Sequence, residues 1–381
     1  MKVYNENSLV NLSNSILKHF GAETFHNTIP EVDELLKGRK KVVAVLFDGM
    51  GQNIVRKHLK ENSFIRSHYV TTINSTFPPT TAAATTAFLT GKYPIETGWL
   101  GWTEYFKDYD KNIILFRSTD YNTDEKLIND DEQNIADKYF PTTKIFELIE
   151  KGNKNVHAFN ISRYPVKKDG PKRLLSEGVN KLTKVLKENE ECFVYFYWDS
   201  PDREMHETGI NSLTTKYQVH KAQRFLKKAF KKNPDTLFIL LADHGHINVK
   251  FLDMCDHQDI YSLLSKPITL EKRAPSFFIK EGKKEEFATL FNKYYGEHFE
   301  LLSKEEALNI KLFGDGNPAK GAIDTLGDFI AISLDEYGLF ASKELAIKSP
   351  NVSIAPSAGF PSPNNLIFNA SSLDSNSKCS P

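Results

Sequence analysis

The chain has 381 residues, of which 40% are hydrophobic and 26% are charged, a composition typical of a globular protein with a sizeable core. The 49 basic residues balance the 49 acidic ones, which argues against a general attraction to nucleic acid or to an anionic membrane surface. The three cysteines are scattered and form no CxxC pair, which argues against a disulfide framework and a thiolate zinc site.

The amino-terminal stretch, MKVYNENSLVNLSNSILKHF, lacks the charged-then-apolar order of a signal peptide. No apolar run approaches the length needed to span a bilayer. We therefore expect a cytoplasmic protein without a membrane segment, with export independent of a signal peptide as the alternative. The sequence carries no signal for an oligomeric state.

The first predicted strand is the apolar run KKVVAVLF, residues 40–47, which ends at Asp48 and Gly49. A short, continuous apolar run of this kind is typical of a parallel strand that is buried on both faces. Ligands of open α/β sheets bind outside the carboxyl ends of the strands, and this strand would place the carboxylate of Asp48 there.

The next informative stretch is TFPPTTAAATTAFLTGKYPIETG, residues 76–98, which predicts a helix that begins near Thr81. A hydroxyl at the N-terminus of a helix lies among free backbone N–H groups, which bind anions such as phosphate. The simpler interpretation is that Thr80 or Thr81 only caps the helix, and it is the better one for this stretch taken alone.

A second apolar run, CFVYFYW at residues 192–198, ends at Asp199 and is followed by PDREMHETG. Asp202 and His206 stand at i and i+4 of a predicted helix, so their side chains project to the same side and are close enough to share one metal ion. An exposed Asp–His ion pair is the common alternative at this spacing.

The third apolar run, TLFILLA at residues 236–242, is followed by Asp243, His244 and Gly245. The glycine permits a sharp turn, so that the carboxylate and the imidazole can face the same cavity. The alternative is a hydrogen-bonded Asp–His couple without a ligand. Turn and cap preferences explain any single aspartate at a strand end, but they explain poorly why all three strands end in this way.

Helical patterns lie between these strands, notably at residues 177–188 and 213–232, and the alternation predicts an α/β fold with a mostly parallel central sheet and helices on both faces. The pattern is less regular from His246 to about Ile310, which we interpret as a small cap insertion before the chain returns to the core at residues 324–333. The expected units are a catalytic core of residues 1–245 and 311–348, a cap of residues 246–310, and a loosely structured or aberrant tail of residues 349–381.

Six side chains carry the chemistry that these elements predict: Asp48, Thr81, Asp202, His206, Asp243 and His244. Mixed carboxylate and imidazole ligands suit zinc or manganese better than calcium. Two such ions about 4 Å apart can clamp the attacking and leaving oxygens of an in-line displacement at phosphorus. A threonine hydroxyl is a poor nucleophile at neutral pH, and we expect Thr81 to be a metal ligand as well, because coordination to a metal lowers the pKa of its hydroxyl.

The ordered set FDGM, TFPPTTAAATTAFLTGKYP, PDREMHETG and ADHGH resembles the type I phosphodiesterase/nucleotide pyrophosphatase branch of the alkaline phosphatase superfamily, from about residue 40 to residue 246. The resemblance implies an alkaline phosphatase-like fold, a small phosphorylated substrate and a phosphothreonine intermediate on Thr81. It also implies two divalent metal ions, zinc first and manganese as the alternative. The implied ligands are Asp48, Asp243 and His244 for one ion and Asp202 and His206 for the other.

Two departures from the family pattern stand out. The family has an Asn that hydrogen-bonds the phosphoryl oxygen, but the matching stretch here is GWLGW, with Trp102 near that position. The backbone N–H of Ala82 is a candidate to replace this Asn.

The second departure concerns the family's third ligand of the second ion, a His near the C-terminus. The corresponding residues 355–359 are APSAG, and no histidine follows His298 in this chain. His246 and His257 are the candidates to take its place, and without a replacement this metal site is incomplete. The tail from about Lys348 is consistent with natural divergence, truncation or a shifted reading frame.

The sequence thus predicts a metal-dependent hydrolase of phosphodiester or pyrophosphate bonds. One alternative is a phosphonate or phosphomonoester hydrolase on the same scaffold. The other is a catalytically weakened homologue that binds phosphorylated ligands and about one metal ion. A sulfatase is disfavoured, because the chain lacks the Cys-x-Pro-x-Arg or Ser-x-Pro-x-Arg site whose Cys or Ser becomes formylglycine.

Overall fold

A parallel sheet forms the centre of the protein, as predicted. The computed structural model describes residues 7–129, 131–162, 175–341, 353–354 and 365–368, the last two as backbone only. The strand order is β6-β7-β1-β8, and all three pairings are parallel. These strands are β1 (Lys41–Phe47), β6 (His157–Ile161), β7 (Cys192–Trp198) and β8 (Leu237–Leu241).

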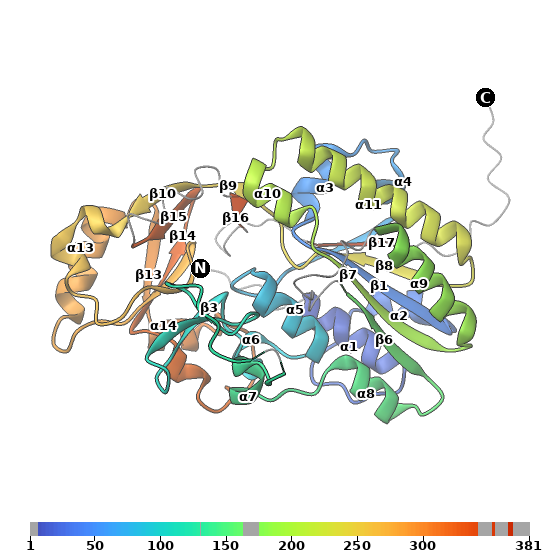
Figure 1. Ribbon diagram of the computed structural model, residues 1–381, viewed down its shortest axis with the longest axis horizontal. Coiled ribbons are helices and arrows are strands. Elements are labelled where there is room, and N and C mark those ends of the chain that lie inside the picture. The colour runs from blue at the N-terminus through green and yellow to red at the C-terminus, as the bar shows by residue number, and fades with distance from the viewer. Residues whose placement is uncertain (1–6, 130, 163–174, 342–352, 355–364, 369–381) are drawn as a thin grey trace.

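The two faces of the parallel sheet are covered by different helices (Figure 1). Alternate residues of β1 point to opposite faces, so Val43 and Val45 enter one apolar cluster while Val42 and Ala44 enter the other. On the Val43 side lie α3 (Gln52–His58), α4 (Phe64–Ser67), α9 (Leu175–Glu188) and α11 (Leu213–Lys232). On the Val42 side lie α1 (Leu9–His19), α2 (Pro30–Leu36), α5 (Thr81–Thr90) and α8 (Ile145–Gly152).

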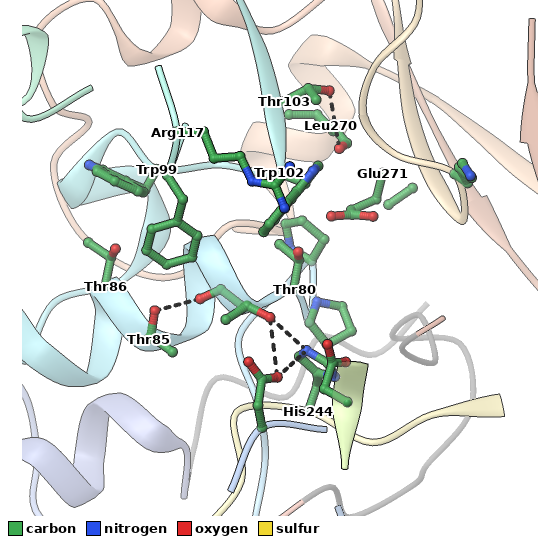
Figure 2. A pocket seen from close by; sticks show the side chains of 18 of the residues that line it. Thr80, Thr85, Thr86, Trp99, Trp102, Thr103, Arg117, His244, Leu270 and Glu271 are labelled. Atoms are coloured by element: carbon green, nitrogen blue, oxygen red, sulfur yellow. Dashed lines mark hydrogen bonds and ion pairs between the residues drawn. The ribbon is translucent and has the colours of Figure 1, made fainter. Parts of the chain in front are cut away.

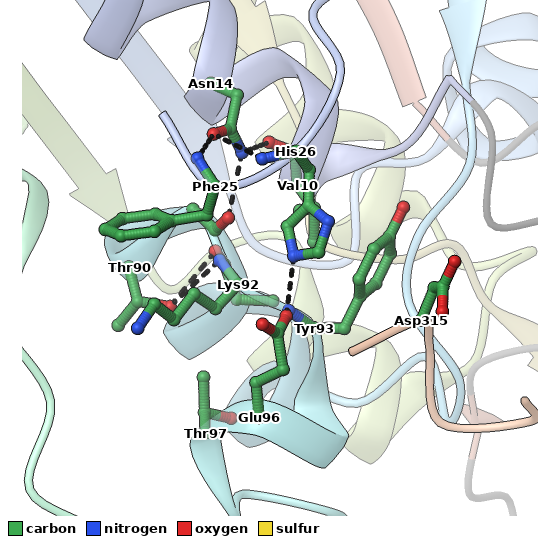
Figure 3. Close-up of polar contacts among 12 residues, drawn as sticks. Val10, Asn14, Phe25, His26, Thr90, Lys92, Tyr93, Glu96, Thr97 and Asp315 are labelled. Atoms are coloured by element: carbon green, nitrogen blue, oxygen red, sulfur yellow. Dashed lines mark hydrogen bonds and ion pairs between the residues drawn. The ribbon is translucent and has the colours of Figure 1, made fainter. Parts of the chain in front are cut away.

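Helix α5 is anchored at its end by a buried polar network around Asn14 of α1 (Figure 3). The Asn14 side-chain amide donates to the carbonyl of Gly91, and its oxygen accepts from the backbone N–H of Phe25, at 2.8 Å and 2.7 Å. One residue on, His26 Nε2 lies 2.6 Å from the Glu96 carboxylate in α6 (Pro94–Thr97). These contacts tie the carboxyl end of α5 to α1, and α6 to the segment that follows α1.

A second sheet of seven strands, paired antiparallel throughout, has the order β13-β14-β12-β11-β3-β4-β5. Its strands are β3 (Thr103–Phe106), β4 (Lys111–Ile114), β5 (Thr119–Asp120), β11 (Thr269–Glu271), β12 (Ala274–Phe277), β13 (Phe299–Ser303) and β14 (Phe329–Ser333). The helices that accompany it are α7 (Ile135–Tyr139), α12 (Gln258–Tyr261), α13 (Lys284–Tyr295) and α14 (Lys304–Asn309).

This second sheet draws on three separated stretches of chain. Residues 103–120 supply one end, residues 269–303 supply the middle and the other edge, and β14 lies between β12 and β13. The segment expected to return to the core at residues 324–333 therefore pairs within the second sheet. The reason is that its apolar side chains, such as Ile330 and Ile332, pack into the cluster beneath this sheet.

Short strands complete the description of the chain. Strand β10 (Lys250–Asp253) pairs in parallel with β15 (Tyr337–Phe340). The predicted tail of residues 349–381 lies largely outside the described residues. Within it, β16 (Ser353–Ile354) pairs with β9 (Ile247–Asn248), and β17 (Asn365–Phe368) pairs with β2 (Tyr69–Ile73). None of the helices within the described ranges has both the length and the apolar character needed to traverse a bilayer.

Candidate functional site

The predicted site residues meet at the carboxyl edge of the parallel sheet. In this sheet Phe47 is in register with Trp198, and Leu46 with Leu241, so the three strands end at one level. The chain segments that follow the strands carry Asp48, Asp202 and Asp243. The first and the last of these aspartates are buried, which is unusual for carboxylates without a partner of opposite charge.

The hydroxyl of Thr81 lies beside the first group of acidic and imidazole side chains. Helix α5 begins at Thr81, as predicted, with Thr80 as its N-cap residue. Thr81 Oγ1 is 3.1 Å from His244 Nε2 and 3.3 Å from Asp48 Oδ1. The hydroxyl therefore stands at a helix N-terminus, next to groups that can bind a cation.

The first candidate metal group consists of Asp48, Asp243 and His244, each of which offers a ligand atom within 4.8 Å of the other two. The Gly49 backbone N–H donates to Asp243 Oδ1 at 3.1 Å, and the Tyr197 hydroxyl donates to Asp48 Oδ2. These two hydrogen bonds fix the carboxylates without using all of their oxygens. The Oδ2 atom of Asp243 is buried and has no hydrogen-bond partner within the described part of the chain.

The carboxylates of this group are in an environment that disfavours their charge. Burial, together with the negative charge of Asp243, holds the pKa of Asp48 well above its usual range. Burial also raises the pKa of Asp243, to about 7. A divalent cation would relieve this repulsion and would bind the Asp243 oxygen that accepts no hydrogen bond, so the residues present fit a metal ion.

The second candidate group consists of Asp202, His244 and His246, again with ligand atoms within 4.8 Å of one another. Helix α10 (Asp202–Thr208) places His206 on the same side as Asp202, as predicted, with Nε2 3.4 Å from Asp202 Oδ1. His246 Nε2 is closer to the same oxygen, at 2.5 Å. Burial opposes ionisation of Asp202, but the imidazoles of His206 and His246 outweigh it and hold the pKa of Asp202 well below its usual range.

Of the two histidines considered as replacements for the family's C-terminal ligand, only His246 lies at this site. His257 instead stacks on Tyr294, with ring centroids 3.9 Å apart, next to helix α13. Sequence reasoning missed the contacts of Tyr197 and Gly49, because they depend on which strands are neighbours. The alternation of β7 places Tyr197 on a known face, but only the pairing with β1 brings it to Asp48.

A cavity of about 1030 Å³ lies next to Thr81 and extends toward the second sheet. The GWLGW stretch lines it through Trp99 and Trp102, and strand β11 lines it through Glu271 (Figure 2). The Trp102 ring lies 6.0 Å from the ring of Phe116, which is partly exposed in the same cavity. Arg117 adds a cation to this wall. The cavity thus has an aromatic and charged side opposite the candidate metal ligands.

The cavity wall that carries the tryptophans contains the buried carboxyl group of Glu104. The titration of this group predicts that the unfolding free energy depends on pH. Glu104 is fully buried and accepts a hydrogen bond of 2.6 Å from the Leu100 N–H, and burial raises its pKa to about 8. Because the pKa is higher in the folded than in the unfolded state, this group stabilises the fold at low pH, and the stabilisation is lost as pH rises from about 4.5 to about 8.

We expect the substitution Glu104→Gln, which keeps the acceptor oxygen, to flatten this dependence. The wild-type protein should lose up to about 4 kcal/mol more of its unfolding free energy than the variant between pH 5 and pH 8. Denaturant unfolding at a series of pH values measures the difference. Parallel stability profiles for the two proteins would show that Glu104 is already ionised in the folded state.

The chain is similar to known proteins in sequence and in fold. The family model of type I phosphodiesterase / nucleotide pyrophosphatase matches residues 42–355. A search of curated proteins gives no match. Among solved structures, murine ectonucleotide pyrophosphatase / phosphodiesterase 5 superposes with a TM-score of 0.63 at 16% identity, over 86% of this chain and 87% of that chain.

Two further solved structures are similar. An inactive variant of the murine protein, in complex with AMP, gives a TM-score of 0.63 at 16% identity, over 87% of each chain. Phosphonoacetate hydrolase from Sinorhizobium meliloti 1021, in complex with phosphonoacetate, gives 0.61 at 13% identity, over 88% of this chain and 91% of that chain. At such low identity the similarity speaks for the fold, and it confirms the predicted alkaline phosphatase-like α/β architecture.

Proposed function

Because the chain belongs to the type I phosphodiesterase/nucleotide pyrophosphatase family, a family of phosphoric ester hydrolases, we propose that it cleaves phosphodiester or pyrophosphate bonds through attack of Thr81 on phosphorus. The observation that carries the proposal is the position of the Thr81 hydroxyl, within 3.3 Å of both Asp48 and His244 at the start of α5. No other threonine hydroxyl is paired in this way with two candidate metal ligands among the hydrogen bonds of the described residues.

The proposed reaction has two steps at phosphorus. In the first, Thr81 Oγ1 forms a bond to phosphorus, its proton passes to solvent, and the bond to the leaving-group oxygen breaks. In the second, water attacks the phosphothreonine, the bond between Oγ1 and phosphorus breaks, and the hydroxyl regains a proton. Backbone N–H groups at the N-terminus of α5, that of Ala82 among them, are available to hold a phosphoryl oxygen.

The metal ligands in this proposal form two sets. Asp48, Asp243 and His244 would hold one ion, and Asp202 and His206 would hold the other. When bound, divalent ions lower the pKa of an alcohol nucleophile and neutralise charge that develops on the phosphoryl group. Mixed nitrogen and oxygen donors favour zinc, with manganese as the alternative.

The leaving group would occupy the cavity between Thr81 and the second sheet. Trp102 and Phe116 offer aromatic faces there, and Arg117 offers a positive charge. A second candidate function, phosphonate hydrolysis, is favoured by the presence of Lys272 in addition to Arg117 in the lining, because two cations suit an anionic substrate with a carboxylate.

The test compares hydrolysis of bis(p-nitrophenyl) phosphate, p-nitrophenyl phosphate and phosphonoacetate, each with added zinc or manganese and with a chelator. Metal-dependent turnover with the highest kcat/KM for the diester supports the proposal. Preferential release of inorganic phosphate from phosphonoacetate would replace it by the phosphonate alternative. Absence of turnover on all three, in protein with about one bound ion, would instead indicate a weakened homologue.

A further inference from the structure

We infer that His246 is a protein ligand of the second metal ion, beside the Asp202 carboxylate. It would take the place of the family's C-terminal histidine, since no histidine follows His298 in this sequence. The inference rests on the two-ion site of the proposed function. It assigns to the second ion a nitrogen donor from the turn after β8, which is a different part of the fold from the C-terminal segment.

The first argument is the placement of the donor atoms. Asp202 Oδ1 has His246 Nε2 at 2.5 Å and His206 Nε2 at 3.4 Å. In a tetrahedral zinc site with bonds of about 2.0–2.1 Å, neighbouring donor atoms stand about 3.3 Å apart. The His206 distance already matches this spacing, and a small rotation of the His246 ring away from the carboxylate would match it too.

The ring of His246 also lies close to two other imidazole rings. The centroid of the His246 ring is 5.0 Å from that of His206 and 5.2 Å from that of His244. His206 is half-exposed, so its side chain can adjust, whereas the side chain of His246 is completely buried. A buried imidazole that faces a carboxylate and two further imidazoles offers a nitrogen-rich site of the kind that binds zinc.

The second argument is that the surrounding backbone makes room for this ring. Gly49 has a φ of +66°, and a Cβ atom built there would lie 2.8 Å from His246 Cδ2 and Nε2 and 3.0 Å from the Cβ atom of Asp202. The Asn53 side-chain amide donates to the His246 carbonyl at 2.5 Å and holds the main chain on the other side. The absent side chain at position 49 thus creates the space in which the ring and the Asp202 carboxylate meet.

The competing explanation is that His246 only orients Asp202 through a hydrogen bond. Outer-shell partners of this kind typically contribute about 10–100-fold to metal affinity, whereas a ligand contributes more. A measurement of the affinity of each ion therefore separates the two roles without reference to catalysis.

The experiment is equilibrium dialysis of the full chain against buffered zinc, with bound metal counted by plasma mass spectrometry. The variants are His246→Gln, Asp202→Asn and, as the matched control, His257→Gln, which removes an imidazole outside the site. We expect two ions per chain in the wild-type protein and in His257→Gln. In His246→Gln we expect one tightly bound ion and a loss of more than about 100-fold in affinity for the second.

Each other outcome decides against the inference. If His246→Gln keeps two ions with less than a hundredfold loss while Asp202→Asn keeps one, His246 is a positioning residue and the proposed function stands. If the wild-type protein itself binds only one ion, the two-ion chemistry of the proposed function fails together with the inference. If His246→Gln keeps the first ion, the variant is folded. If His246→Gln does not fold, the same measurement is made on His246→Asn.

Discussion

Replacement of Thr81 by Ala is expected to lower kcat/KM for bis(p-nitrophenyl) phosphate by about 10⁴-fold or more and to leave the metal content unchanged. The physical reason is that the substitution removes the atom that forms the bond to phosphorus. It leaves in place every carboxylate and imidazole around it. The Thr81 hydroxyl contacts Asp48 and His244 but completes neither group of three candidate ligands.

Two further variants control this experiment. Thr81→Ser keeps a hydroxyl at the helix N-terminus and should retain activity within about tenfold of the wild type. Thr289→Ala removes a hydroxyl that donates only to the Glu285 carbonyl on helix α13, far along the chain from the site, and should leave kcat/KM unchanged. Turnover by Thr81→Ala above about a tenth of the wild-type rate would refute the assignment of the nucleophile.

Removal of divalent metal is expected to abolish turnover and to lower the thermal unfolding midpoint, and added zinc or manganese should restore both. An ion whose free concentration is 100 times its dissociation constant stabilises the folded state by about 2.7 kcal/mol. In the metal-free protein, by contrast, the buried carboxylates of Asp48 and Asp243 repel each other.

The variant Asp48→Asn distinguishes loss of the metal from a general loss of structure, because its effect on the unfolding temperature should differ in direction with and without metal. Without metal at neutral pH, it should unfold at a higher temperature than the metal-free wild type, because burying an amide avoids the cost of burying a repelled carboxylate. With saturating metal the order should reverse, since the variant lacks one ligand. Thermal unfolding of both proteins with a chelator and with zinc measures the four midpoints. Identical midpoints for the wild type under both conditions would argue against bound metal.

Several parts of this site follow from local sequence. The apolar runs at residues 40–47, 192–198 and 236–242 are strands β1, β7 and β8, because a short continuous apolar segment is stable only when it is buried on both faces. Parallel neighbours then bring their carboxyl ends to one edge, so Asp48 and Asp243 meet there. The i, i+4 spacing of Asp202 and His206 likewise needs only one helical turn.

The antiparallel sheet could not be predicted in the same way. Its strands are short, and they pair with partners that lie far apart in the chain, as Leu270 does with Thr103. Such pairings depend on which apolar surfaces remain uncovered after the core has formed, not on the residues of one strand. Phe329–Ser333 has the pattern of a core strand but pairs with β12 and β13 for this reason.

The sequence by itself thus determined the family motifs, the parallel core and the six residues proposed for chemistry, because each depends on spacing within one element or on the end of one strand. Only the tertiary structure decided that His246 lies 2.5 Å from Asp202 while His257 stacks on Tyr294. Both histidines follow β8, and the sequence does not show which of them reaches the Asp202 carboxylate. The difference arises from packing between distant segments, in which Gly49 leaves the space that the ring of His246 occupies.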